Sequence, residues 1–72
     1  MFQGLHDPIA LGLHQRHVPV LLEILTGATD AEIASHLWLS KRTVEHYTAD
    51  ILEAYGCRRR VELIVRSTRE VG

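Results

Sequence analysis

One stretch decides the fold, GATDAEIASHLWLSKRTVEHY (residues 27–47), because it holds two helix starts separated by a tight turn. Thr29 and Glu32 fit a capping box, in which the threonine hydroxyl accepts a backbone N–H and the glutamate reaches back to the N-cap N–H. Ser40 is a good N-cap for a following helix. The apolar residues between these caps fall at helical spacing: Ile33, Ala34 and Leu37. The stretch therefore predicts a short helix over residues 30–37 and a second helix directly after Ser40.

The second of these helices is predicted to run from Lys41 to about Tyr55. Gly56 follows at the position where helices commonly end in a left-handed residue. From the 3.6-residue period, its core-facing residues are predicted to be Val44, Tyr47, Ile51 and Ala54 or Tyr55. Its other side chains are then expected to face solvent.

A helix is also predicted upstream of this pair, from about Arg16 to Thr26, with Gly27 as its stop. Because proline is tolerated only in the first turn of a helix, regular structure is expected to begin near His17 or Val18, with Pro19 in that turn. The apolar face of this helix is predicted to consist of Val18, Leu21, Leu22 and Leu25.

A fourth helix is predicted downstream, over about residues 60–69. One side of it carries Val61, Ile64, Val65 and Thr68, with Leu63 adjacent. No segment shows the alternation of a convincing strand. The fold class expected from the sequence is therefore all-α, with four helices.

The first residues are predicted to form an irregular lead-in or linker, because glycines and the Asp7-Pro8 pair interrupt any regular pattern. Asp7 as N-cap, with Pro8 at the first helical position, can start a short helical turn. The predicted organisation is a lead-in at 1–13 and a helix-turn-helix domain at 14–72, with the motif itself at about 28–47.

Length and composition narrow the class of protein. The 72 residues are enough for one domain, and a hydrophobic fraction of 46% is ample for one core. No run approaches the roughly 20 apolar residues of a membrane-spanning helix, and the start lacks the basic region of a secretory signal, so no membrane partner is expected. Cys57 is the single cysteine, which excludes an internal disulfide and a cysteine-built zinc site. A reducing, cytoplasmic location is expected.

The charge is distributed unevenly along the chain. The net charge of -1 does not by itself indicate a nucleic-acid binder. Residues 1–40 hold one basic and four acidic residues, whereas residues 41–72 hold seven basic and five acidic residues. One basic face directed at phosphates would give this pattern, and so would an ordinary solvated surface.

A helix-turn-helix needs a short buried helix that braces a longer one, and the longer helix must expose polar side chains at its N-terminal end. Such side chains lie away from the predicted apolar stripe: Lys41, Arg42, Glu45, His46 and Ala49. Backbone N–H groups near Thr29 and Ser40, at the two helix N-termini, are further candidate phosphate contacts. The residues thus predict that the second helix of the pair binds double-stranded DNA.

The ordered set of these residues resembles the LuxR-type (GerE) helix-turn-helix family. The family's glycine, Glu-Ile-Ala, leucine, aliphatic-Ser pair and Thr-Val occur in register at Gly27, 32–34, Leu37, 39–40 and 43–44. The pattern continues through Ile51, Gly56, Arg60, Glu62 and Leu63. Cys57 stands at a position that is aliphatic in the family. The resemblance covers roughly residues 13–70.

The resemblance implies a four-helix unit whose third helix enters the major groove and whose fourth helix forms a homodimer on two-fold symmetric DNA sites. Phosphate contacts are implied at the starts of the third and fourth helices, for Lys41, Arg42, Thr43, Arg58, Arg59 and Arg60. Contacts to base edges are implied for Glu45, His46 and Ala49, and Val44 of the same segment is counted with the DNA-binding residues. Dimer contacts are implied for Val61, Ile64, Val65 and Thr68. The resemblance implies no cofactor and no metal.

Some positions depart from the family pattern. His14 and His17 replace its Thr…Glu cap, and Pro19 replaces the next glutamate. Glu45 stands at a commonly basic recognition position, and Tyr47 replaces a common histidine. Glutamate cannot aid phosphate affinity but can accept a hydrogen bond from cytosine N4. Weak binding by the monomer is therefore expected.

Two other functions stay open at this stage. A protein-interaction module that keeps the fold, with weak or no DNA binding, would also fit the near-neutral charge and Glu45. His14 and His17 could supply two metal ligands, but nothing in the sequence brings His36 or His46 to them, so surface histidines are expected. An enzyme is not expected, because the sequence shows no catalytic grouping and has little length for a pocket.

Three residues receive structural interpretations. Tyr47 and Trp38 are expected to be core or core-edge aromatics, and Cys57 a small buried hydrophobe. A chain of this length has no room for signal reception. That favours either a fragment of a longer regulator with a sensory domain, or a stand-alone regulator that takes its input from a partner protein.

Overall fold

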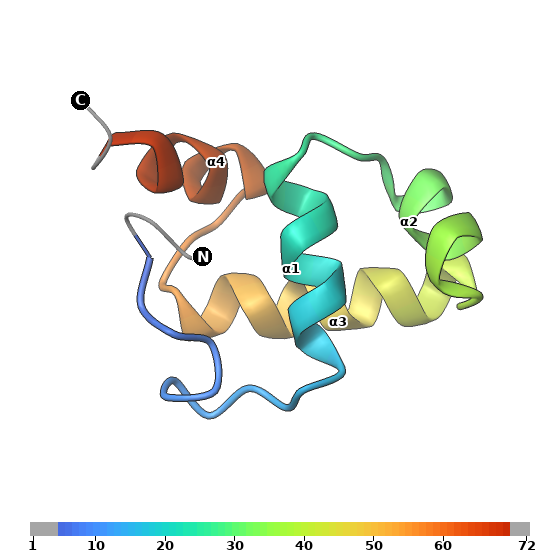
Figure 1. Cartoon of the computed structure of the whole chain (residues 1–72), viewed down its shortest axis with the longest axis horizontal. Coiled ribbons are helices and arrows are strands. Elements are labelled where there is room, and N and C mark those ends of the chain that lie inside the picture. The colour runs from blue at the N-terminus through green and yellow to red at the C-terminus, as the bar shows by residue number, and fades with distance from the viewer. Residues whose placement is uncertain (1–4, 70–72) are drawn as a thin grey trace.

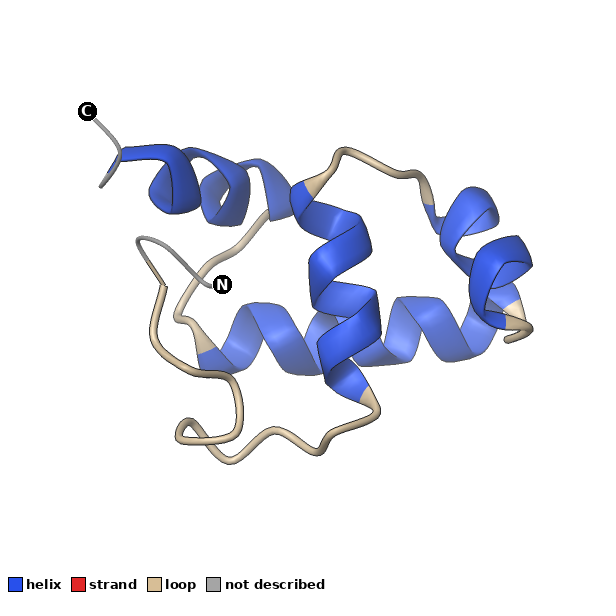
Figure 2. Cartoon of the chain, viewed as in Figure 1, coloured by secondary structure: helices blue, strands red, loops and turns tan. Residues whose placement is uncertain are grey.

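A computed structural model describes residues 5–69, which form four α-helices and no strand (Figures 1 and 2). The helices are α1 (His17–Leu25), α2 (Asp30–Leu37), α3 (Lys41–Ala54) and α4 (Arg60–Arg69). The predicted all-α fold is confirmed, and each helix begins and ends within one residue of its predicted bounds. Within the described residues, none of these helices is long and apolar enough to cross a membrane.

The longest helix, α3, runs across the molecule, and α1 crosses it in Figure 1. The short α2 packs against α3 and α1, beside the end at which α3 begins. On the other side of α1, α4 packs against α1 and α3. The first helix of the predicted helix-turn-helix therefore braces the beginning of the second.

Both predicted N-caps are confirmed. The Thr29 hydroxyl accepts the Glu32 N–H (3.2 Å), and the Glu32 carboxylate accepts the Thr29 N–H (2.8 Å), which completes the capping box of α2. The Ser40 hydroxyl accepts the Thr43 N–H (3.0 Å) at the start of α3. Gly56 follows the end of α3 with a φ of 67°, a conformation that glycine adopts without steric cost. Local signals thus determine the helix boundaries.

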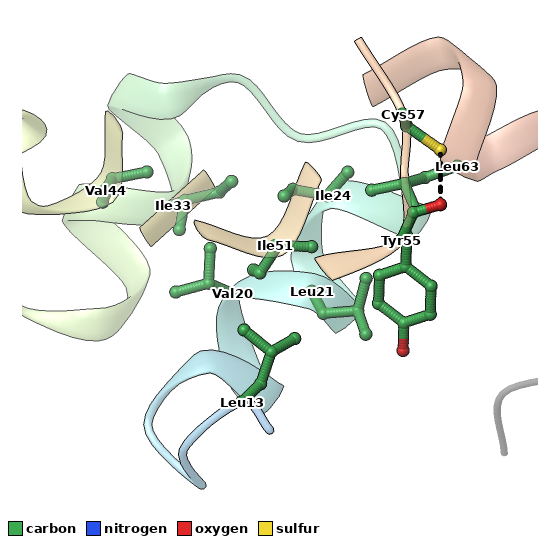
Figure 3. Close-up of a cluster of buried hydrophobic side chains, with 10 residues drawn as sticks. All are labelled: Leu13, Val20, Leu21, Ile24, Ile33, Val44, Ile51, Tyr55, Cys57 and Leu63. Carbon is green, nitrogen blue, oxygen red and sulfur yellow. Dashed lines mark hydrogen bonds between the residues drawn. The ribbon is translucent and has the colours of Figure 1, made fainter. Parts of the chain in front are cut away.

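The hydrophobic core is built by all four helices (Figure 3). Its fully buried side chains are Val20, Leu21, Ile24, Ile33, Val44, Ile51 and Leu63. Tyr55 and Cys57 extend the core beyond the end of α3. Cys57 is a buried free thiol whose Sγ lies 3.7 Å from the Tyr55 carbonyl oxygen, so its interpretation as a small buried hydrophobe is confirmed.

The predicted apolar face of α1 is wrong in part. Leu22 is 36% exposed, whereas Val20 and Ile24 are fully buried. His17, expected at the surface, is also buried. Because α1 is apolar on almost every side, several faces fit the helical period equally well, and only packing against the other helices selects one.

Two further interpretations need correction. Trp38 is not a core-edge aromatic, since it is 94% exposed. It is the C-cap of α2 and has a left-handed φ of 57°, and the next residue, Leu39, packs against the core in its place. Thr48 of α3 is buried although the apolar pattern omitted it, whereas Tyr47 lies at the core edge as predicted.

The described part of the lead-in packs against the helices. Leu13 belongs to the core, and the Tyr55 hydroxyl donates to the His6 carbonyl oxygen (2.6 Å). Asp7 caps the turn that follows it, as predicted, because its carboxylate accepts the Ile9 N–H (2.9 Å). The division into a lead-in at 1–13 and a domain at 14–72 stays a prediction, and Gly4 of that lead-in lies outside the described residues.

Candidate nucleic-acid interface

Five of the side chains predicted to face DNA share one exposed surface of α3, between Lys41 and Ala49. The exposed residues are Lys41, Arg42, Glu45, His46 and Ala49. An open hollow on this surface is lined by Arg42, Thr43, Glu45, His46 and Tyr47. The structure therefore brings together the residues that the sequence placed at the start of the recognition helix.

The opposite side of α3 holds the helix in a fixed rotation. Val44, Thr48 and Ile51 lie at i, i+4 and i+7 and are all buried. Val44 was counted among the DNA-binding residues, and that assignment is wrong because its side chain lies inside the core. It acts instead as an anchor that turns Lys41 and Arg42 toward solvent.

The hydroxyl groups at the start of α3 are occupied by its own cap. Ser40 Oγ donates to Thr43 Oγ1 (2.8 Å) while accepting the Thr43 N–H (3.0 Å). Lys41 and Arg42 are different, because neither forms an ion pair with any of residues 5–69. Their charges are therefore free to attract a polyanion.

The Thr29 N–H is bonded as the predicted capping box requires, and only N–H groups near Thr29 were predicted to contact phosphates. The Thr29 N–H donates to the Glu32 carboxylate, and this bond is the main reason why the pKa of Glu32 is lowered. Asp30 and Glu32 also give the first turn of α2 negative charge. An acidic, internally bonded helix end is a poor phosphate site. The DNA contact assigned to Thr29 stays a prediction.

The three arginines that precede or begin α4 have different surroundings. Arg58 and Arg59 are exposed, and their backbone N–H groups donate to the Glu62 carboxylate (3.1 Å each). Their side chains remain at the surface near the start of α4. They stay candidates for phosphate contacts.

Arg60 is part of the fold. Its guanidinium donates to the Ala28 carbonyl oxygen (3.2 Å) and forms an ion pair with Asp30. The side chain of Arg60 is only 31% exposed. This guanidinium joins the start of α4 to the start of α2, so Arg60 has a structural role. Its phosphate contact stays a prediction.

A contact that the sequence did not predict joins α1 to α3. His17 Nε2 lies 3.1 Å from Asp50 Oδ2, and His17 Nδ1 accepts the His14 N–H (3.1 Å). The neutral ring with its proton on Nε2 satisfies both partners. The Tyr47 ring lies 5.0 Å from the His17 ring. The sequence offered one indication that His17 is buried. It lies three residues before Val20, on the face of α1 that packs into the core.

The histidines do not assemble a metal site among residues 5–69, where no group of three or more His, Cys, Asp or Glu side chains is placed to hold an ion. His36 instead lies 2.8 Å from the Glu23 carboxylate, as measured from its Nδ1. This hydrogen bond is the main cause of the raised pKa of His36. His36 therefore ties the last turn of α2 to α1.

The predicted dimer surface on α4 is largely accessible. Val61 and Val65 are each 50% exposed and line a surface hollow with Glu62 and Arg66. Leu63 is buried on the other side of the helix. The other two predicted dimer residues are the half-buried Ile64 and the exposed Thr68.

The chain matches the model of a known protein family. The model of the bacterial regulatory proteins of the luxR family matches residues 12–67, which include all of the helix-turn-helix and most of α4. Searches of curated proteins and of solved structures gave no significant match. The chain belongs to the LuxR family of bacterial regulatory proteins, a family of DNA-binding regulators of transcription.

Proposed function

We propose that this chain regulates transcription by placing the first half of α3 in the major groove of a DNA duplex. One observation carries the proposal: Lys41 and Arg42 are exposed and free of ion pairs within the described residues, while the opposite side of α3 is locked into the core. A helix held at this rotation presents its first turn as a rigid unit, as the helix-turn-helix requires.

The exposed side chains divide into two roles. Lys41 and Arg42 contact phosphates, which gives affinity without sequence preference. Glu45, His46 and Ala49 lie further along the same face and meet base edges. Glutamate accepts from cytosine N4, and alanine can contact a thymine methyl group, so these residues carry the sequence preference.

Dimerisation through α4 supplies the affinity that one small domain lacks. Val61 and Val65 offer exposed apolar surface on one side of this helix. Two copies joined here would place two α3 helices on the half-sites of a two-fold symmetric DNA sequence. Arg58 and Arg59, near the start of α4, add phosphate contacts. We place this activity in the cytoplasm, where a bacterial chromosome lies.

A titration of labelled duplex with the purified chain, followed by fluorescence anisotropy, tests the proposal. We expect affinity to fall steeply between about 50 and 200 mM salt, because bound cations displace counterions from DNA. R42A should weaken binding to every sequence and reduce the salt slope by about 1. R16A is the matched control, because Arg16 is an exposed arginine at the start of α1, which packs on the core side of α3.

Variants of Glu45 test the recognition role separately. E45Q should change which sequences are selected from a random duplex pool, because an amide pairs with adenine better than with cytosine. Absence of binding at low salt, at protein concentrations that force dimers, would contradict the proposal. That outcome would favour a protein-interaction module built on the same fold.

A further inference from the structure

Trp38 combines two unfavourable features in the turn of the helix-turn-helix. Its side chain is 94% exposed, and its backbone has a φ of 57°. The left-handed conformation at a helix end is usually taken by glycine or asparagine, which have no bulky side chain to expose. A residue that breaks local rules in this way points to a function.

The turn holds Trp38 firmly. Its backbone N–H donates to the Ala34 carbonyl oxygen, as does that of Leu39 (3.0 Å). Leu39 packs against the core, and Ser40 caps α3 immediately afterwards. The indole is therefore presented by a fixed backbone rather than by a loose loop.

The neighbours of Trp38 indicate what covers it. Lys41, three residues later, begins the exposed cationic surface of α3, and Arg42 follows. The indole offers an apolar ring and one N–H donor but no acceptor. A DNA strand offers the complement, because its deoxyriboses are apolar and its phosphates only accept. By contrast, Tyr55 is buried and its hydroxyl already donates to His6.

We propose that Trp38 is a DNA-contacting residue, whose ring packs on a deoxyribose at the edge of the major groove and whose Nε1–H donates to a neighbouring phosphate. This inference rests on the proposed docking of α3. It extends the DNA contact surface from α3 back into the turn. Trp38 would then anchor the register of α3 on one strand, while base contacts come from the helix itself.

Trp38 is the chain's single tryptophan, so its fluorescence reports on this contact directly. We expect unlabelled duplex to quench or shift the emission, with saturation at the same duplex concentration as the anisotropy of labelled duplex. Anisotropy that rises while emission stays constant would overturn the inference and leave the proposed function intact. If neither signal changes, both proposals fail.

Substitution gives a second test. W38G suits the left-handed backbone, so the fold should be kept, as circular dichroism can verify. We expect its DNA affinity to fall about tenfold, with an unchanged salt slope because no cation is removed. W38F keeps an aromatic ring but has no N–H donor. Its DNA affinity should lie between that of W38G and that of the unaltered chain. I9S, which removes an exposed apolar residue from the lead-in, is the control and should bind like the unaltered chain.

Two results would overturn the inference. One is a W38G variant that binds duplex as tightly as the unaltered chain. The other is an emission shift on raising protein concentration without DNA, which would mean that Trp38 contacts a second copy of the chain.

Discussion

The two helices of the helix-turn-helix begin with the same kind of cap but end up in opposite situations. At the start of α2, the cap is a reciprocal box between Thr29 and Glu32, and Asp30 pairs with Arg60 of α4. At the start of α3, Ser40 caps the helix, but no acidic residue occupies the first turn. The first helix start is closed by the protein itself, and the second is left open.

The charged residues in the first turns of α2 and α3 also differ. Acidic residues stabilise the N-terminus of a helix and basic residues destabilise it, by about 0.3 to 1 kcal/mol each. Asp30 and Glu32 follow this rule in α2, whereas Lys41 and Arg42 oppose it in α3. The start of α3 is thus less stable than it could be, as expected where selection acts on binding rather than on stability.

The largest expected effect is a loss of stability on weakening the packing of α2, the helix that braces the start of α3. Ile33 is the buried residue of α2, so I33A should lower the free energy of unfolding by about 3 kcal/mol. Chemical denaturation measures this loss. S35A, at an exposed position of the same helix, should change it by less than about 0.5 kcal/mol. Similar stability of the two variants would mean that α2 does not brace the domain.

Substitutions of Arg60 and Arg42 should have opposite effects, because Arg60 bonds to the start of α2 and Arg42 lies unpaired at the start of α3, within the described residues. R60M should cost about 1 to 2 kcal/mol of stability, a range that allows for the partial exposure of the Arg60–Asp30 pair. R42M should leave stability unchanged or slightly raised, since it removes a cation from a helix N-terminus. DNA affinity, measured where both variants are folded, should show the reverse order. An R60M variant that is stable but defective in binding would indicate that Arg60 contacts DNA.

Substitutions of the two cap residues should have smaller effects on stability. T29A and S40A should each cost about 1 kcal/mol in thermal or chemical unfolding. T29A should cost more, because it breaks a reciprocal box. S40A should in addition weaken DNA binding, because fraying of the first turn displaces Lys41 and Arg42. Weaker binding by T29A than by S40A would contradict the distinction between the two starts.

The sequence predicted the features that depend on near neighbours. Caps such as Ser40 and stops such as Gly56 act within a few residues, so all four helices were placed to within one residue. The exposed face at the start of α3 followed from the same periodicity. The order of the motif residues across 27–47 then indicated the family, which the match over residues 12–67 confirmed.

The sequence could not predict the features that depend on distant partners. Arg60 has a structural role because the fold brings it to Asp30, and the buried His17 lies opposite Asp50. Trp38 was expected in the core because it is aromatic, but the left-handed turn directs it to solvent. In each case residue type did not reveal this arrangement, because the partner or the backbone conformation was not visible in the local pattern.

The smallest expected effect lies at the far end of α2. Glu23 raises the pKa of His36 above its ordinary value of 6.5, chiefly through their hydrogen bond and then through charge. The folded state therefore favours the protonated ring. The resulting stability is fully present below the ordinary pKa and is lost as pH rises through the raised value. Because the ring is solvent-exposed, the change in stability should be small.

E23Q should lower the pKa of His36 toward its ordinary value, as an NMR titration of the imidazole protons would show. E45Q, which removes an exposed carboxylate from α3, is the matched control and should leave the titration of His36 unchanged. DNA affinity should not respond to E23Q, because this pair lies between α1 and α2. If E23Q left the titration unchanged, the pair would be absent in solution, and His36 would not tie the last turn of α2 to α1.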